Sequence, residues 1–189
     1  MELREQKNIL RRQLLEQAAG LEQAYCRRAD REITSRLFLL PEYKKAEVLF
    51  CFVGTEREID TRPLILDALK LGKRVGVPKC TGKGVMEGRE IKGLWKLEPG
   101  KYGIMEPDVG CPLIVPEEID LCLIPCLSAS LKGARLGYGG GYYDRYLPFV
   151  KGTKAVLCRQ RMMCQEIPRE GHDVGMDMVV SENGVVQCR

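Results

Sequence analysis

Val48-Leu49-Phe50-Cys51-Phe52-Val53-Gly54-Thr55 is the stretch that decides the fold. Its apolar run has the length of a strand buried on both faces, and the Gly-Thr pair ends it. Helix signals follow, with Asp60 or Thr61 at the N-cap, Pro63 in the first turn and Gly72 beyond the end. A buried strand that leads directly into a helix is typical of an α/β protein with a parallel sheet.

The same pattern continues on both sides of this stretch. Further buried strands are predicted for residues 74–78, 120–125, 155–158 and 178–180, with an added strand at 86–91 and a short helix from Tyr142 to about Leu147. Two amphipathic helices, separated near Ala19-Gly20, are predicted from apolar residues at helical spacing: Leu3, Leu10, Leu14, Leu21, Tyr25, Ala29, Ile33, Leu37 and Leu40. We therefore expect a single domain over residues 1–189, an α/β three-layer sandwich with a mainly parallel, Rossmann-like sheet preceded by two N-terminal helices.

Composition restricts the class of protein. With 44% hydrophobic and 30% charged residues, the chain has the balance of an ordinary globular protein. No apolar run approaches the roughly 20 residues that span a bilayer, and no apolar secretory segment is present, so we predict a cytoplasmic protein with no membrane partner. Nine cysteines without any Cys-x-x-Cys pair indicate reduced thiols and not a zinc site.

The charge gives little reason to expect a nucleic acid. The net charge is only +4, and residues 1–45 carry +3 of it, from ten Lys/Arg and seven Asp/Glu. Nucleic-acid binders usually show a denser basic stripe with aromatic residues that stack on bases, and aromatics make up only 6% of this chain. We predict no nucleic-acid partner, because an anionic small molecule fits the charge equally well.

The strongest functional signal is Gly137-Tyr138-Gly139-Gly140-Gly141-Tyr142-Tyr143-Asp144-Arg145. Glycines permit positive φ, so successive N–H groups can converge on an anion, and the helix that follows adds partial positive charge. Arg135 and Arg145 flank the glycines and can pair with phosphoryl oxygens. The common phosphate loops do not match, because there is no Gly-Lys-Ser/Thr ending and Tyr142 stands where a third glycine is needed. The stretch predicts a phosphate-binding loop of another kind, and a glycine-rich turn without a ligand is the alternative.

Arg135 to Arg145 resembles the signature of the 5-formyltetrahydrofolate cyclo-ligase family, also called methenyltetrahydrofolate synthetases. The resemblance covers nearly the whole chain through Lys7 to Arg11 (Lys-x-x-x-Arg in the family), Glu58-Ile59-Asp60-Thr61 (Glu-Ile-Asp-Thr), Tyr102-Gly103-Ile104-Met105-Glu106-Pro107 (Tyr-Gly-Ile-x-Glu-Pro) and His172-Asp173 with Asp177. Ala129-Ser130 departs from the family, which usually has Phe-Asp there.

The resemblance implies a reaction and its partners. The family closes 5-formyltetrahydrofolate to 5,10-methenyltetrahydrofolate with ATP and Mg²⁺, so the expected partner is a reduced folate and the expected protein a monomer. The implied mechanism phosphorylates the formyl oxygen, lets N10 attack the activated carbon and expels phosphate. The protein must then supply placement and charge neutralisation for phosphoryl transfer.

The resemblance also implies roles for individual residues. The expected ATP-binding residues are Lys7, Arg11, Arg135, Gly137, Tyr138, Gly139, Gly140, Gly141, Tyr142, Tyr143, Asp144 and Arg145. The expected substrate-binding residues are Val53, Glu58, Tyr102, Gly139, Gly140, Gly141 and Tyr142. Arg145 and Tyr143 are expected to be catalytic, and Asp144 and Asp177 to bind Mg²⁺.

Simpler roles are the alternatives for several of these residues. Lys7 and Arg11, which share a helix face, fit a solvated surface, Tyr102 fits simple packing and Asp144 fits a favourable place at a helix start. His172, the only histidine, fits a structural role. Two other functions are the alternatives for the whole chain: a related ATP-dependent enzyme acting on another N-formyl or anionic substrate, suggested by Ser130, and a non-catalytic nucleotide-binding or RNA-associated module.

Overall fold

The structure, a computed structural model, describes residues 2–100 and 103–188. Its centre is an eight-stranded sheet in the order β12-β11-β10-β7-β1-β2-β3-β6. These strands are β1 (Val48–Cys51), β2 (Arg74–Gly82), β3 (Val85–Ile91), β6 (Leu113–Ile114), β7 (Leu121–Ile124), β10 (Thr153–Leu157), β11 (Met178–Ser181) and β12 (Gly184–Gln187). The strands from β11 through β10, β7 and β1 to β2 are parallel, and β12, β3 and β6 extend the sheet antiparallel at its two edges.

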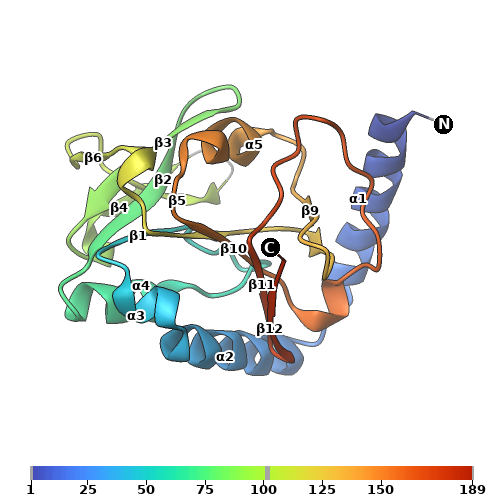
Figure 1. Ribbon diagram of the computed structural model, residues 1–189, viewed down its shortest axis with the longest axis horizontal. Helices are drawn as coiled ribbons and strands as arrows, with labels where there is room; N and C mark the ends of the chain where they lie inside the picture. The colour runs from blue at the N-terminus through green and yellow to red at the C-terminus, as the bar shows by residue number, and fades with distance from the viewer. Residues whose placement is uncertain (1, 101–102, 189) are drawn as a thin grey trace.

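Helices cover both faces of this sheet (Figure 1). The α-helices are α1 (Leu3–Ala19), α2 (Gln23–Leu39), α3 (Pro41–Lys45), α4 (Arg62–Lys70) and α5 (Tyr142–Tyr146). Helices α2, α3 and α4 lie along one face, α5 lies on the other, and α1 stands at the end of the molecule (Figure 1). Alternate strand residues serve two cores, because Leu49 and Leu123 cluster with residues of α2 and α4 whereas Phe50 and Cys122 cluster with residues of α5. The predicted α/β fold with a mainly parallel sheet is confirmed.

The predicted elements all form, with shifted ends. Strand β2 is the clearest difference, because it continues beyond the predicted 74–78 as far as Gly82 and pairs with β3 as a long antiparallel hairpin. Two small sheets were not predicted: β4 (Leu97–Pro99) with β5 (Met105–Pro107), and β8 (Ser128–Ala129) with β9 (Arg135–Leu136). Strands this short carry too few residues to show an alternation in the sequence.

The two N-terminal helices differ in how well the apolar pattern describes them. Helix α2 buries the predicted Tyr25, Ala29, Ile33 and Leu37 against the sheet. In α1 the pattern is wrong for Leu3, which is 44% exposed, whereas a charged residue of the same helix, Lys7, is buried. None of the helices in the described part of the chain has the length and apolar character needed to cross a membrane.

The order of the parallel strands places a crevice at β1. The chain passes from β1 through α4 to β2 on one side, and the strands that come later, β7, β10 and β11, lie on the other side of β1. In open α/β sheets, ligands bind outside the carboxyl ends of the strands at the point where the order reverses. Phe52 and Pro125, the first residues beyond β1 and β7, mark this point.

We predict that Leu123→Ala will destabilise the protein by about 2–5 kcal/mol, because Leu123 is fully buried in the central strand β7 and its truncation leaves a cavity. The matched control is Leu39→Ala, since Leu39 is 71% exposed and its truncation should change stability by less than about 0.5 kcal/mol. Urea unfolding followed by circular dichroism measures both variants. Equal losses in the two variants would contradict the assignment of Leu123 to the core.

Candidate active site

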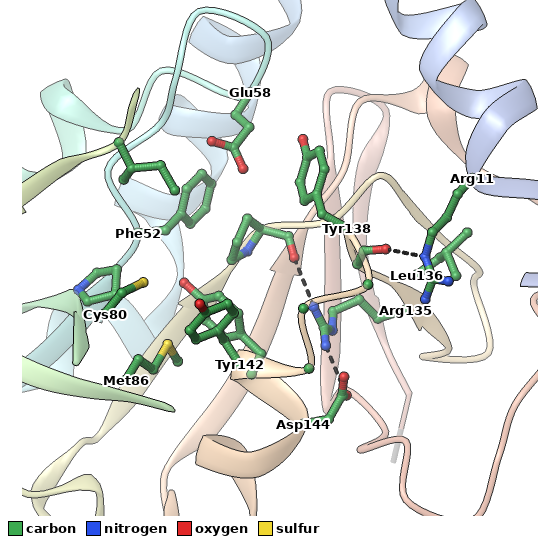
Figure 2. A pocket seen from close by; sticks show the side chains of 18 of the residues that line it. Arg11, Phe52, Glu58, Cys80, Met86, Arg135, Leu136, Tyr138, Tyr142 and Asp144 are labelled. Atoms are coloured by element: carbon green, nitrogen blue, oxygen red, sulfur yellow. Dashed lines mark hydrogen bonds and ion pairs between the residues drawn. The ribbon is translucent and has the colours of Figure 1, made fainter. Parts of the chain in front are cut away.

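A cavity of about 1020 Å³ opens at the crevice beyond β1 and β7. Its apolar part is lined by Phe52, Val53, Pro78, Met86, Ile104 and Pro125, and its polar part by Lys7, Arg11, Arg135, Asp144, Glu170, His172 and Asp173. Figure 2 shows Phe52 and Met86 on one side of Tyr142, and Arg11 and Asp144 on the other. The volume lies at the top of the range usual for small-molecule sites, roughly 300–1,000 Å³, so the cavity has room for a large ligand or for two ligands side by side.

The glycine-rich loop forms one wall of this cavity, as residues 137–144 all line it. Gly139 and Gly141 have φ angles of +95° and +68°, a region that glycine adopts without strain. Arg11 Nε donates a hydrogen bond to the Gly137 carbonyl oxygen at 3.0 Å, so helix α1 contacts the loop directly (Figure 2).

Arg135 fixes the start of α5 from below the loop. Its Nη2 donates to Asp144 Oδ1 at 2.9 Å, its Nη1 donates to the Pro125 carbonyl oxygen at 3.4 Å, and its guanidinium lies 5.5 Å from the centre of the Tyr143 ring. Burial raises the pKa of Tyr143 well above its ordinary value, and its hydroxyl is buried without a hydrogen-bond partner among the described residues. The hydroxyl therefore stays protonated at neutral pH and can donate to a ligand.

Lys7 brings a buried positive charge to the polar part of the cavity. Its Nζ lies 2.7 Å from Glu170 Oε2 and 2.5 Å from Asp173 Oδ2. Burial opposes ionisation of Asp173, but the hydrogen bond from Lys7 and one from the Glu170 backbone outweigh it and hold the pKa of Asp173 below its ordinary value. The hydrogen bond from Lys7 likewise lowers the pKa of Glu170. Both carboxyl groups are therefore ionised at neutral pH.

Arg11 is close enough to both Asp144 and Asp173 for each carboxylate to attract its guanidinium. Burial lowers the pKa of Arg11, and its attraction to Asp173 and Asp144 opposes that effect. The two carboxylates thus share one cation and one cavity, although they are far apart in the sequence. Nearby, Glu170, His172 and Asp173 each offer a metal-ligand atom within 4.8 Å of the others.

The loop after β1 is held in place by Thr61, which is fully buried. Thr61 Oγ1 donates to the Phe52 carbonyl oxygen at 2.6 Å and accepts from the Gly54 N–H at 3.1 Å. A side chain at Gly54 would meet the Ile59 carbonyl oxygen at 2.0 Å, so only glycine fits this turn. The loop presents Glu58, which lines the cavity and lies across from Tyr138 in Figure 2.

Most of the predicted site residues come together here. Those that line the cavity are Lys7, Arg11, Val53, Glu58, Arg135, Gly137, Tyr138, Gly139, Gly140, Gly141, Tyr142, Tyr143 and Asp144. Arg145 is not among them, because its Nη1 donates to the carbonyl oxygens of Gly84, at 3.3 Å, and Gly140, at 3.2 Å, and so joins the β2–β3 turn to the glycine-rich loop. Tyr102 lies outside the described residues.

Asp177, predicted as a metal ligand, lies at the other end of the sheet. Its Oδ2 accepts a hydrogen bond from the Lys154 N–H at 2.9 Å, next to the amino ends of β10 and β11, whereas the cavity is at the carboxyl ends of the parallel strands. The structure therefore does not bring Asp177 together with Asp144. Asp173 is the carboxylate of this segment that lines the cavity.

Sequence reasoning missed part of the site. Glu170 and Asp173 were not predicted as site residues, and His172, interpreted as structural, also lines the cavity. The apolar wall contributed by Met86 and Ile104 comes from a stretch with little periodicity. Phe52 and Pro125 had a usable signal, because each lies at the carboxyl end of a predicted strand.

Comparison with known proteins agrees with this geometry. The model of the 5-formyltetrahydrofolate cyclo-ligase family matches residues 3–182. The chain belongs to this family. It is therefore a ligase, and the resemblance inferred from its motifs is confirmed.

Individual relatives cover most of the chain. The 5-formyltetrahydrofolate cyclo-ligase of Mycolicibacterium smegmatis is 33% identical, over 73% of this chain and 75% of its own length. That of Saccharomyces cerevisiae is 28% identical, over 95% of this chain and 97% of its own. The solved structure of Aquifex aeolicus 5,10-methenyltetrahydrofolate synthetase superposes with a TM-score of 0.87 and 33% identity, covering 97% of this chain and 93% of that one.

We predict that Lys7→Met will lower stability near neutral pH and flatten its acid dependence. The lowered carboxyl pKa values of Glu170 and Asp173 stabilise the fold above the ordinary carboxyl pKa, and this stabilisation is lost as the pH falls through the folded-state values. Without Lys7 the two carboxylates repel each other, and their protonation no longer costs stability.

Unfolding free energies from urea titrations between about pH 7 and about pH 3 test this prediction. The control is Lys132→Met, which breaks an ion pair with Glu166 whose side chains are 75% and 80% exposed and which should contribute little. An unchanged pH slope in Lys7→Met would contradict the prediction.

Proposed function

We propose that this protein catalyses the ATP-dependent closure of 5-formyltetrahydrofolate to 5,10-methenyltetrahydrofolate. The observation that carries the proposal is one continuous cavity with an apolar part at the ends of β1 and β7 and a polar part, with the cationic side chains of Lys7, Arg11 and Arg135, at the glycine-rich loop. A folate offers a planar ring system and ATP offers a triphosphate, and phosphoryl transfer requires the two to be adjacent. Family membership and the names of the relatives support the same reaction.

The two parts of the cavity suggest which ligand each one takes. Residues 137–141 supply a glycine-rich backbone beside Lys7, Arg11 and Arg135, which suits the ATP phosphates. Val53 and Glu58 line the cavity beyond the end of β1, where an apolar wall and a carboxylate suit a ring that bears N–H groups. In this proposal Tyr142, between the two parts in Figure 2, lies where the ligands meet.

The reaction requires the formyl oxygen to become a leaving group. It takes the γ-phosphoryl group from ATP with release of ADP. N10 then attacks the formyl carbon and loses its proton to water, and phosphate departs with the oxygen. The protein contributes by positioning both ligands and neutralising charge. Lys7 and Arg11 offset the negative charge, and the protonated Tyr143 hydroxyl is available to donate to a ligand oxygen. Arg145 supports the step by holding Gly140 in place.

The polar part of the cavity also fits Mg²⁺. Mg²⁺ prefers carboxylate, phosphate and water oxygens, and Asp144 and Asp173 supply carboxylates around Arg11. We propose that these two residues hold the ion. Glu170 is near Asp173, because the ligand atoms of Glu170, His172 and Asp173 lie within 4.8 Å of one another. When bound, the ion neutralises charge on the phosphates.

The alternatives have less support. Ser130, the residue that suggested another substrate, is buried, does not line the cavity and accepts the Ala134 N–H at 3.3 Å, so it serves the β8–β9 turn. Lys7 and Arg11 are engaged with groups at the cavity and are not presented to an RNA. We keep a cytoplasmic monomer without a nucleic-acid partner as part of the proposal.

Purified protein mixed with 5-formyltetrahydrofolate, ATP and Mg²⁺ should form the methenyl absorbance band. We predict that Asp144→Asn and Asp173→Asn each lower kcat by about 100-fold or more and shift the Mg²⁺ titration to higher concentration, because each removes charge beside the transferring group. Asp177→Asn, the matched control, should stay within about threefold of the wild type, since its carboxylate lies at the far end of the strands.

An absence of ATP-dependent product from the wild type would refute the proposed function. A loss in Asp177→Asn as large as that in Asp173→Asn would instead refute the choice of metal ligands.

A further inference from the structure

A buried ion pair lies directly behind the loop that carries Glu58. Arg159, just beyond the end of β10, is only 7% exposed. Its Nε lies 2.7 Å from Asp30 Oδ1 and its Nη2 lies 3.0 Å from Asp30 Oδ2, so the two side chains form a bidentate pair between β10 and helix α2.

The pair also contacts the backbone of the loop at three points. Arg159 Nη1 donates to the Arg57 carbonyl oxygen at 3.1 Å, and Nη2 donates to the Glu58 carbonyl oxygen at 2.7 Å. Asp30 Oδ2 accepts the Asp60 N–H at 3.1 Å. Residues 57–60 are therefore fixed from both the carbonyl and the amide side by a single ion pair. Only the planar guanidinium has donors in the right directions for this arrangement, because an ammonium group is a compact point charge.

Stability alone is a weak explanation for such a pair. Burial lowers the pKa of Arg159, and the hydrogen bonds with Asp30 more than offset that effect, so the guanidinium stays charged inside the protein. Buried ion pairs often stabilise a fold no more than apolar residues of the same size would. What apolar residues could not provide is the set of hydrogen bonds to the Arg57, Glu58 and Asp60 backbone.

Neither member of the pair lines the cavity, whereas Glu58, whose backbone they hold, does. The Glu58 side chain makes one hydrogen bond within the loop, because its Oε2 accepts the Thr55 N–H at 3.0 Å. The glycine-rich loop is held by other hydrogen bonds, those that Arg11 and Arg135 donate. The ion pair thus acts on the folate end of the cavity and not on the ATP end.

We propose that Arg159 and Asp30 are positioning residues that set where Glu58 presents its carboxylate, and that they thereby control affinity for the ring portion of the reduced folate. This inference rests on the proposed function for the identity of the ligand. It requires an intact ion pair, because either partner alone leaves an unpaired charge behind the loop.

The test compares Arg159→Lys with the matched control Arg36→Lys. Arg36 Nε and Nη2 also donate to a backbone carbonyl oxygen, that of Glu182, but neither Arg36 nor Glu182 lines the cavity. Arg159→Lys should raise KM for 5-formyltetrahydrofolate about tenfold or more and leave KM for ATP within about twofold. Arg36→Lys should change neither. The double variant Asp30→Asn with Arg159→Gln, which leaves no unpaired buried charge, should show the same split if the single variant folds poorly.

Amide hydrogen exchange of residues 55–60 gives a readout that does not depend on activity. Exchange there should become at least about tenfold faster in Arg159→Lys and stay unchanged in Arg36→Lys. Unchanged exchange, or a parallel rise of both KM values, would overturn the positioning role. A wild type that makes no product would overturn the proposed function, and the exchange measurement would still decide whether the pair holds the loop.

Discussion

Parallel pairing of β1 with β2 on one side and β7 on the other is the constraint on which the rest of the molecule depends. All residues of β1 are buried, as expected for a strand at the centre of a layered sheet. The segments that connect its two neighbours, β2 and β7, to the rest of the chain run in different directions. The space left between those segments cannot be filled by regular structure. It becomes the crevice, and the residues beyond Cys51 and Ile124 become its lining.

Charged side chains from remote parts of the chain complete the crevice. Helix α1 reaches the glycine-rich loop through Arg11 and the segment before β11 through Lys7. Apolar packing of α1 is limited, with Leu14 as its buried apolar residue. Lys7 and Arg11, which make the contacts to the loop and to the segment before β11, also line the cavity, so the position of the helix is tied to the shape of the site.

The sequence was sufficient to predict the layers and the place of the glycine-rich loop before α5, because both depend on local patterns. Apolar runs such as 48–53 need no knowledge of the rest of the chain, and three successive glycines before Tyr142 permit the positive φ angles found at Gly139 and Gly141. The remaining features depend on contacts between distant residues. Burial of Lys7, the place of Asp173 and the loop contacts of Arg159 follow from packing, and no spacing rule connects them. For the same reason Asp177, and not Asp173, was predicted as a metal ligand. Both are acidic residues of one segment that precedes β11, and only the fold places Asp173 at the cavity and Asp177 beside the amino end of β11.

The bonds of Lys7 to Glu170 and Asp173 join positions that are 163 and 166 residues apart. During synthesis, helix α1 emerges from the ribosome long before its partners exist. Lys7 therefore remains in water, without these partners, while the central strands are synthesised and packed. Lys7 can thus complete its part of the cavity only after residues 170–173 have been synthesised.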